Sequence, residues 1–420
     1  MKSAFLEPER AVRHGEVCVI SLAIALAFTG CQTAPLPRDQ ALSRARVERD
    51  GDLPVIHLSG TPYEIGYQHG RLLRNEVRAH YRSAFAFMET VPKFRLFTRF
   101  QVNWYLGRIW DELLPHVPKD YLEEMRGLAD GSGVNLLDIH RAHAIPDVFP
   151  THCSVGAFWG AATEGGRFLQ IRNLDWSRSL GVHNHACVFV VSPQGKRRFV
   201  NLGFIGFIGV LSGMNDRGIA IGQVGSTSVD QTHDGTSFIF LLRRILEEAE
   251  NADAGARIVR EAKRTVGINY LIGSAREKKA IALETTARHF AQFTEADPNE
   301  AKSPYAVPLT NAVFRADTAF DPVIRDLQTC SRGDPKKPGL EPPDGSAYEK
   351  RYLWQADMVK EHHGRIGTNE VFALAKRIAM KSNIQSVVYA YPEFWVAYAK
   401  DDAKAADGEY HRFHIDELLK

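Results

Sequence analysis

Cys153 is the residue of this sequence whose position is best suited to covalent chemistry. It stands at the first residue of a predicted β-strand, directly after a long helical segment, and His152 precedes it. If the His152–Cys153 bond were cut, Cys153 would carry both a thiol and a free α-amino group, whose ordinary pKa of about 7.7–8.0 makes it a partial base near neutral pH. Such an amine can activate its own thiol without a separate histidine. A half-buried structural cysteine is the alternative interpretation.

Three further segments place polar residues at predicted strand ends and turns. They are RNLDW (172–176), GMNDRG (213–218) and LTNAVF (309–314). A guanidinium near a thiol favours the thiolate, and amide N–H groups can donate to an oxyanion. Taken singly, Arg172 and Asp175 also fit a surface ion pair in a turn, and Asn215 also fits a hairpin loop.

In their order and spacing, Cys153 and these segments resemble the N-terminal-nucleophile (Ntn) hydrolases of the acyl-coenzyme A:6-aminopenicillanic-acid acyltransferase family. Choloylglycine hydrolase and acid ceramidase are more distant relatives. The resemblance runs from about Thr61 to the C-terminus and implies an α+β fold, the four-layer αββα sandwich, with an N-terminal helical prosegment. The site residues that it implies are Cys153 as nucleophile, Arg172 as the cation beside its sulfur, Asp175 as the holder of the freed amine, and Asn311 and Asn215 as oxyanion donors.

The resemblance also implies self-cleavage of the His152–Cys153 bond, after which the Cys153 thiolate attacks the carbon–nitrogen amide bond of an N-acylated small molecule. Water or an amine would release the acyl-enzyme, so the protein would be an amidohydrolase or acyltransferase. One alternative is an uncut papain-like peptidase that uses His183, His185 or His289 as its base. Another is a non-catalytic envelope lipoprotein whose Ntn scaffold serves as a binding module.

The elements that must position these residues change character near residue 151. From Thr61 to about Ala144 apolar residues recur three and four apart, which predicts amphipathic helices. Short β-rich runs with turn signals follow, and they predict antiparallel strands. Helical segments at 237–250, 253–265 and 368–381 interrupt the strands. Strand blocks alternating with helix pairs favour an α+β fold over a doubly wound parallel sheet.

The first residues have the pattern of an export signal. Basic residues precede the apolar run of residues 17–29, which is too short for a membrane-spanning helix and ends at Gly30-Cys31. Phe28–Cys31 resembles a bacterial lipobox, so Cys31 is the predicted lipid anchor and the predicted location is the cell envelope, at the outer membrane facing the periplasm. The predicted regions are a signal peptide (1–30), a tether (31–60), a helical prosegment (61–152) and a catalytic region (153–420), with both cleavage fragments remaining associated.

Composition and missing motifs exclude other classes. The 420 residues contain 52 basic and 50 acidic side chains, and this balance predicts no nucleic-acid partner. The sequence lacks GxSxG, HExxH, GxxxxGK[ST] and CxxC motifs, so neither a metal nor a cofactor is predicted. Cys187 and Cys330 would remain in the exported body beside Cys153, and two buried thiols are preferred to a disulfide between them.

Overall fold

A computed structural model describes residues 38–90, 99–149, 151–303, 306–329 and 347–420. The predicted signal peptide, Cys31 and Cys330 lie outside the described residues. Within these ranges no helix is both long and apolar enough to cross a membrane. Cys187 is a buried free thiol.

Two β-sheets form the centre of the fold. The larger has nine strands in the order β1-β2-β5-β6-β7-β8-β9-β10-β11, and the smaller has six in the order β12-β3-β4-β13-β14-β15. The strands are β1 (Arg46–Asp50), β2 (Leu53–Gly60), β3 (His152–Phe158), β4 (Leu169–Asp175), β5 (Ala186–Pro193), β6 (Phe199–Phe204), β7 (Gly213–Asn215), β8 (Ile219–Gly225), β9 (Ile268–Ser274), β10 (Lys279–Thr285), β11 (Phe290–Phe293), β12 (Ala312–Arg315), β13 (Asn383–Ala390), β14 (Glu393–Tyr398) and β15 (His411–His414).

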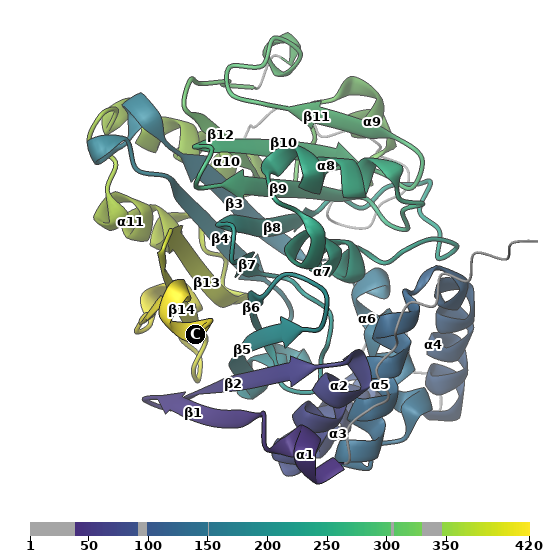
Figure 1. The fold of residues 1–420 in the computed structure, drawn as a ribbon. Coiled ribbons are helices and arrows are strands. Elements are labelled where there is room, and N and C mark those ends of the chain that lie inside the picture. Colours follow the sequence, from purple (N-terminus) through teal and green to yellow (C-terminus); the bar gives the residue numbers. More distant parts are fainter. Residues whose placement is uncertain (1–37, 91–98, 150, 304–305, 330–346) are drawn as a thin grey trace, which may run out of the picture. The chain divides into compact units, whose positions relative to one another are not determined.

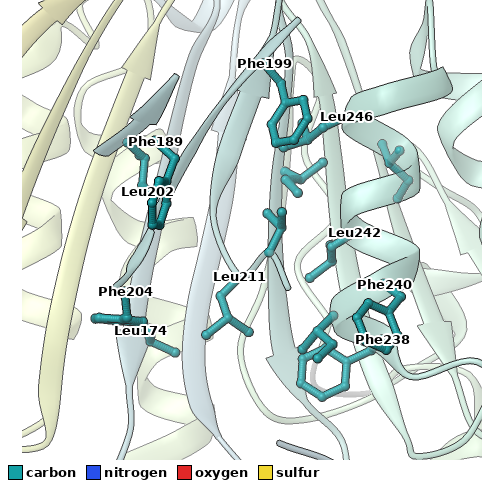
Figure 2. Close-up of a cluster of buried hydrophobic side chains, with 14 of the residues drawn as sticks. Leu174, Phe189, Phe199, Leu202, Phe204, Leu211, Phe238, Phe240, Leu242 and Leu246 are labelled. Atoms are coloured by element: carbon teal, nitrogen blue, oxygen red, sulfur yellow. The ribbon is translucent and has the colours of Figure 1, made fainter. Parts of the chain in front are cut away.

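Helices cover the outer face of each sheet. α7 (Phe238–Glu248) and α8 (Ala252–Glu261) pack on the nine-stranded sheet, whereas α10 (Ala347–Glu361) and α11 (Thr368–Ile378) pack on the six-stranded sheet. β3 and β4 contact β8 between the sheets, which completes four layers (Figure 1). Figure 2 shows part of the buried core, in which Leu246 of α7 lies beside Phe199 of β6. The predicted α+β four-layer sandwich is therefore confirmed.

A group of helices precedes β3. The group contains α2 (Pro62–Leu72), α3 (Arg74–Thr90), α4 (Arg99–Leu113), α5 (Lys119–Ser132) and α6 (Leu136–Val148). α2 begins with a capping box in which Thr61 and Glu64 bond each other's backbone N–H groups. Glycines let α2 and α5 approach closely, because a Cβ at Gly66 would lie 1.9 Å from the carbonyl oxygen of Glu124. The short helices α1 (Arg38–Leu42), α9 (Pro322–Leu327) and α12 (Ile415–Leu418) complete the set.

The predicted tether over 31–60 is wrong for residues 38–60, which form α1, β1 and β2. β2 pairs in parallel with β5, so the predicted antiparallel pairing does not hold for this pair of strands. The apolar side chains of β2 are buried in the core. β1 is a polar, exposed edge strand, and its sequence resembles that of a tether. The helices α2–α6 and the strands β3 and β4 of the other sheet separate β2 from β5 and supply the long crossover that a parallel pair requires.

Candidate active site

Cys153 is the second residue of β3, and its side chain is fully buried. Successive side chains of a strand point to opposite faces. Cys153 and Val155 accordingly belong to the core between the sheets, whereas the Ser154 hydroxyl accepts a hydrogen bond of 3.1 Å from Arg351 of α10 on the other face. The start of β3 therefore presents a thiol to the interior of the sandwich.

Arg172 lies on β4, in register with Val155 of β3 and on the same inner face as the thiol. Its side chain is fully buried, and its Nε donates to the carbonyl oxygen of Leu211 at 3.5 Å. Burial raises the pKa of the Cys153 thiol above its usual value, and the positive charge of Arg172 opposes this by stabilising the thiolate. The structure thus places the guanidinium charge beside the sulfur.

Asp317 occupies the other side of the His152–Cys153 bond. Its Oδ1 accepts the backbone N–H of Cys153 at 3.3 Å, and its Oδ2 lies 3.1 Å from Nδ1 of His152. Burial lowers the pKa of His152, but the hydrogen bond and charge of Asp317 outweigh that effect and raise it above its usual value. One carboxylate therefore holds both residues of the predicted cleavage site.

Asp175 lies on the outer face of β4, because it is three residues from Arg172 and strand side chains alternate. Its Oδ2 accepts a hydrogen bond of 2.9 Å from Nη1 of Arg351. Arg351 also donates from Nη2 to Asp317 at 2.6 Å, so the guanidinium joins the two carboxylates. Among the described contacts, the Cys153 N–H donates its hydrogen bond to Asp317 and not to Asp175.

Sequence reasoning missed Asp317 and Arg351. Neither belongs to a recognisable motif, and each reaches the site through tertiary pairing. β12 pairs with β3 so that Arg315 faces Val155, and two more residues along each antiparallel chain bring Asp317 beside Cys153. The sequence did contain one unused signal, since the odd spacing of Arg172 and Asp175 in RNLDW already implied opposite faces.

The two predicted oxyanion asparagines are not brought to Cys153. Asn311 bonds Trp159 and Ala161 at the far end of β3, about 17 Å from Cys153 at roughly 3.3 Å per strand residue. Asn215 is buried, donates from Nδ2 to Leu246 and Ala249 oxygens, and accepts with Oδ1 from the N–H groups of Arg217 and Ile219. Both amides therefore bond the backbone of turns and loops in this structure. For Asn215 this agrees with the hairpin-loop interpretation given above.

Two glycines of β8 let the nine-stranded sheet approach the candidate site closely. A Cβ at Gly222 would lie 2.7 Å from the Val155 side chain and 2.9 Å from that of Arg172. A Cβ at Gly225 would lie only 2.0 Å from the carbonyl oxygen of Thr151. These positions fix the segment before Cys153 against the opposite sheet, and a larger side chain at either would push the layers apart.

An apolar cavity lies between the helical segment and the strands. Tyr81 and Pro146 line it from α3 and α6, and Trp176 and Leu211 line it from the body. Leu211 also provides the carbonyl that accepts from Arg172, so the cavity adjoins the residues around the thiol.

The described residues contain no group of three His, Cys, Asp or Glu side chains placed to hold a metal ion. Three histidines were considered as a separate base, and two of them, His183 and His185, lie in the short turn before β5. His185 stacks on His80, and the backbone of His289 pairs with Thr286 at the edge of the larger sheet. Among the described contacts, the histidine joined to the cleavage site is His152 itself.

A family model described as acyl-coenzyme A:6-aminopenicillanic acid acyl-transferase matches residues 161–301. The match includes Arg172, Asp175 and Asn215, and it begins after Cys153. Protein dcd1B of Dictyostelium discoideum is 29% identical over 262 residues, which cover 58% of this chain and 52% of that protein. The chain thus spans about half the length of this relative. The predicted resemblance to the acyltransferase family is confirmed.

Two further proteins are similar to parts of this chain. Acid ceramidase of Rattus norvegicus is 23% identical over 222 residues, covering 46% of this chain and 55% of that enzyme. Penicillin V acylase from Agrobacterium tumefaciens, a solved structure, superposes with a TM-score of 0.42 at 10% identity, over 64% of this chain and 87% of that chain.

Proposed function

Because this chain resembles the acyl-coenzyme A:6-aminopenicillanic acid acyltransferase family, we propose that it is a cysteine Ntn hydrolase or acyltransferase of N-acylated small molecules. The observation that carries the proposal is that the nitrogen and the sulfur of Cys153 have different charged partners. Its nitrogen is bonded by the Asp317 carboxylate, and its buried thiol lies beside the Arg172 guanidinium. An amine that serves as base and a thiolate that serves as nucleophile require such opposite partners.

The first step would be self-cleavage. The Cys153 sulfur attacks the carbonyl carbon of His152, the carbon–nitrogen bond breaks, and the thiol proton passes to the departing nitrogen. The products are a thioester between the His152 carbonyl and the sulfur, and a free amine on Cys153. Water then hydrolyses the thioester, which leaves the carboxylate of His152 and the regenerated thiol.

The two fragments would remain bound to each other after this cut. β2 of the N-terminal fragment is hydrogen-bonded to β5 of the C-terminal fragment. Glu124 of α5 also forms a buried ion pair of 2.6 Å with Arg243 of α7. Both contacts join the two sides of the proposed cut, so they would hold the fragments together.

In turnover, the Cys153 thiolate would attack the carbonyl carbon of a substrate amide. The α-amine takes the thiol proton and delivers it to the leaving nitrogen, so that an amine departs and a thioester acyl-enzyme remains. Water or a second amine then accepts the acyl group. The rat relative named acid ceramidase supports an N-acyl substrate for this chain, and the apolar cavity beside Leu211 suits an apolar acyl group.

Intact-mass analysis of purified wild type and Cys153→Ala tests the proposal. Wild type is expected to give two fragments, the second of which begins at Cys153. Cys153→Ala is expected to remain one uncut chain. It should also show no turnover of N-acyl amides in a substrate series of graded acyl-chain length. A Cys153→Ser control separates processing from catalysis, because a serine hydroxyl can support slow self-cleavage of the chain while it hydrolyses substrate poorly. An uncut wild type that remains active would contradict the free-amine mechanism and favour the papain-like alternative.

A further inference from the structure

The carboxylate that holds the nitrogen of Cys153 comes from outside RNLDW. Asp317 follows β12, and its Oδ1 lies 3.3 Å from the Cys153 nitrogen. Asp175, the residue expected there from the family resemblance, is instead bonded to Arg351 on the outer face of β4. Resting on the proposed function, we infer that Asp317 is the positioning residue for the Cys153 amine, both before and after self-cleavage.

Several contacts keep Asp317 in place. Its side chain is nearly buried, and Oδ2 receives a 2.6 Å hydrogen bond from Arg351 in addition to the contact with His152. Its own carbonyl oxygen accepts from Nε2 of Gln328 at 2.9 Å. The loop after β12 is held further by Glu284, which accepts the N–H groups of residues 320 and 321 at 2.8 Å each. Asp317 is therefore fixed from both sides while Oδ1 remains directed at the nitrogen of Cys153.

During self-cleavage this geometry favours the thioester. The new amine can attack the thioester and restore the peptide bond only while it is neutral. A carboxylate within hydrogen-bond distance stabilises the ammonium form, because opposite charges favour ionisation. By holding the ammonium, it slows the reverse reaction and leaves time for water to hydrolyse the thioester.

In the mature enzyme the same contact strengthens the amine as a base. The ammonium that forms when the thiol gives up its proton lies against the Asp317 carboxylate, while Arg172 stabilises the thiolate. The amine should therefore have a pKa above its ordinary value of about 7.7–8.0. Loss of the Asp317 charge would weaken both members of the thiolate–ammonium pair.

The structure offers a matched control, because Asp175 and Asp317 each bind Arg351. Asp317→Asn and Asp175→Asn are both nearly isosteric and both remove one negative charge from that guanidinium. Each variant is followed by mass spectrometry for the rate of self-cleavage, with thermal unfolding to verify the fold. Because Asp317→Asn keeps the shape of the side chain but loses the charge-assisted hydrogen bond to the ammonium, it should slow cleavage by about 10²-fold, whereas Asp175→Asn should slow it by less than tenfold. Equal slowing of both variants, or wild-type cleavage by Asp317→Asn, would overturn the inference.

A second measurement needs no variant. Selective ¹⁵N labelling of cysteine in cleaved wild type gives the Cys153 nitrogen the chemical shift of an amine, and its titration yields the pKa of that group. A value above about 8.0 agrees with the inference, and a value at or below the ordinary range rejects it. The proposed function fails separately, if wild type is never cut or if Cys153→Ala retains turnover. Normal cutting by Asp317→Asn would overturn the inference alone.

Discussion

Burial and Arg172 act on the Cys153 thiol in opposite directions. The thiol is fully buried, which penalises the thiolate, and the guanidinium charge compensates part of that penalty. The charge of Arg172 is therefore more important here than it would be for an exposed cysteine. At an exposed site, water would stabilise the thiolate without it.

Arg172→Met should remove this compensation and raise the pKa of the thiol. The pH profile of Cys153 alkylation by excess iodoacetamide, followed by mass, is expected to shift upward by at least about one pH unit, which corresponds to about 1.4 kcal/mol. Arg172→Lys is the control because it retains a positive charge. If Arg172→Met folds and its profile coincides with that of wild type, the guanidinium does not support the thiolate.

At the scale of elements, the close approach of β8 to the segment before β3 positions the His152–Cys153 bond. Gly225 has no side chain where a Cβ would meet the backbone of Thr151 at 2.0 Å. The contact involves backbone on one side, so a flexible side chain cannot move away to relieve it. The position of the candidate site thus depends on a glycine in a different sheet.

Gly225→Ala is expected to displace residues 151–153 and slow self-cleavage by about 10²-fold, since an error of about 1 Å in a reacting group has that order of cost. The matched control is Gly107→Ala in α4, where the new Cβ would meet only Nε of Arg141, at 3.8 Å. That control should cleave normally and gain about 0.5–1 kcal/mol of stability from better helix propensity. Intact-mass time courses measure cleavage, and wild-type kinetics in Gly225→Ala would contradict the positioning role.

At the scale of the whole molecule, buried histidines of the helical segment accept hydrogen bonds from the backbone of residues 205–208. The Gly206 N–H donates to Nε2 of His69 at 2.8 Å, and the Ile208 N–H donates to Nε2 of His143 at 3.0 Å. An Nε2 that accepts must be unprotonated, so both rings are neutral. Burial, assisted by the neighbouring histidines and less by Arg243, lowers the pKa of each histidine to about 3.

The pH dependence follows from the direction of these shifts. Between about pH 6.5 and pH 3 the unfolded histidines bind protons that the folded ones exclude, so stability is complete above pH 6.5 and falls as the solution becomes more acidic. Each histidine contributes up to about 1.4 kcal/mol per pH unit in that window. In urea unfolding at pH 7, 6 and 5, His143→Gln should flatten the slope by about this amount. An unchanged slope would show that the ring does not resist protonation.

The sequence alone determined the character of each segment. Apolar periodicity predicted the helices of residues 62–148 and most strands after residue 151, because side-chain burial follows the geometric period of each element. It also predicted a strand at Cys153, after a helical region, and a family resemblance that the comparison of residues 161–301 confirmed. The polar strand β1 and the true partners of Asn311 were beyond such reasoning, since neither follows from local pattern.

Tertiary structure decided which charges meet at Cys153. Asp317 lies 164 residues from Cys153 along the chain, and Arg351 lies 176 residues from Asp175. Their meeting depends on the pairing of β12 with β3 and on α10 covering the outer face of that sheet. A local sequence pattern sets the face on which a side chain lies, but the register between distant strands sets its neighbours. The thiol was therefore visible in the sequence, whereas the carboxylate that holds its nitrogen appeared only in the folded chain.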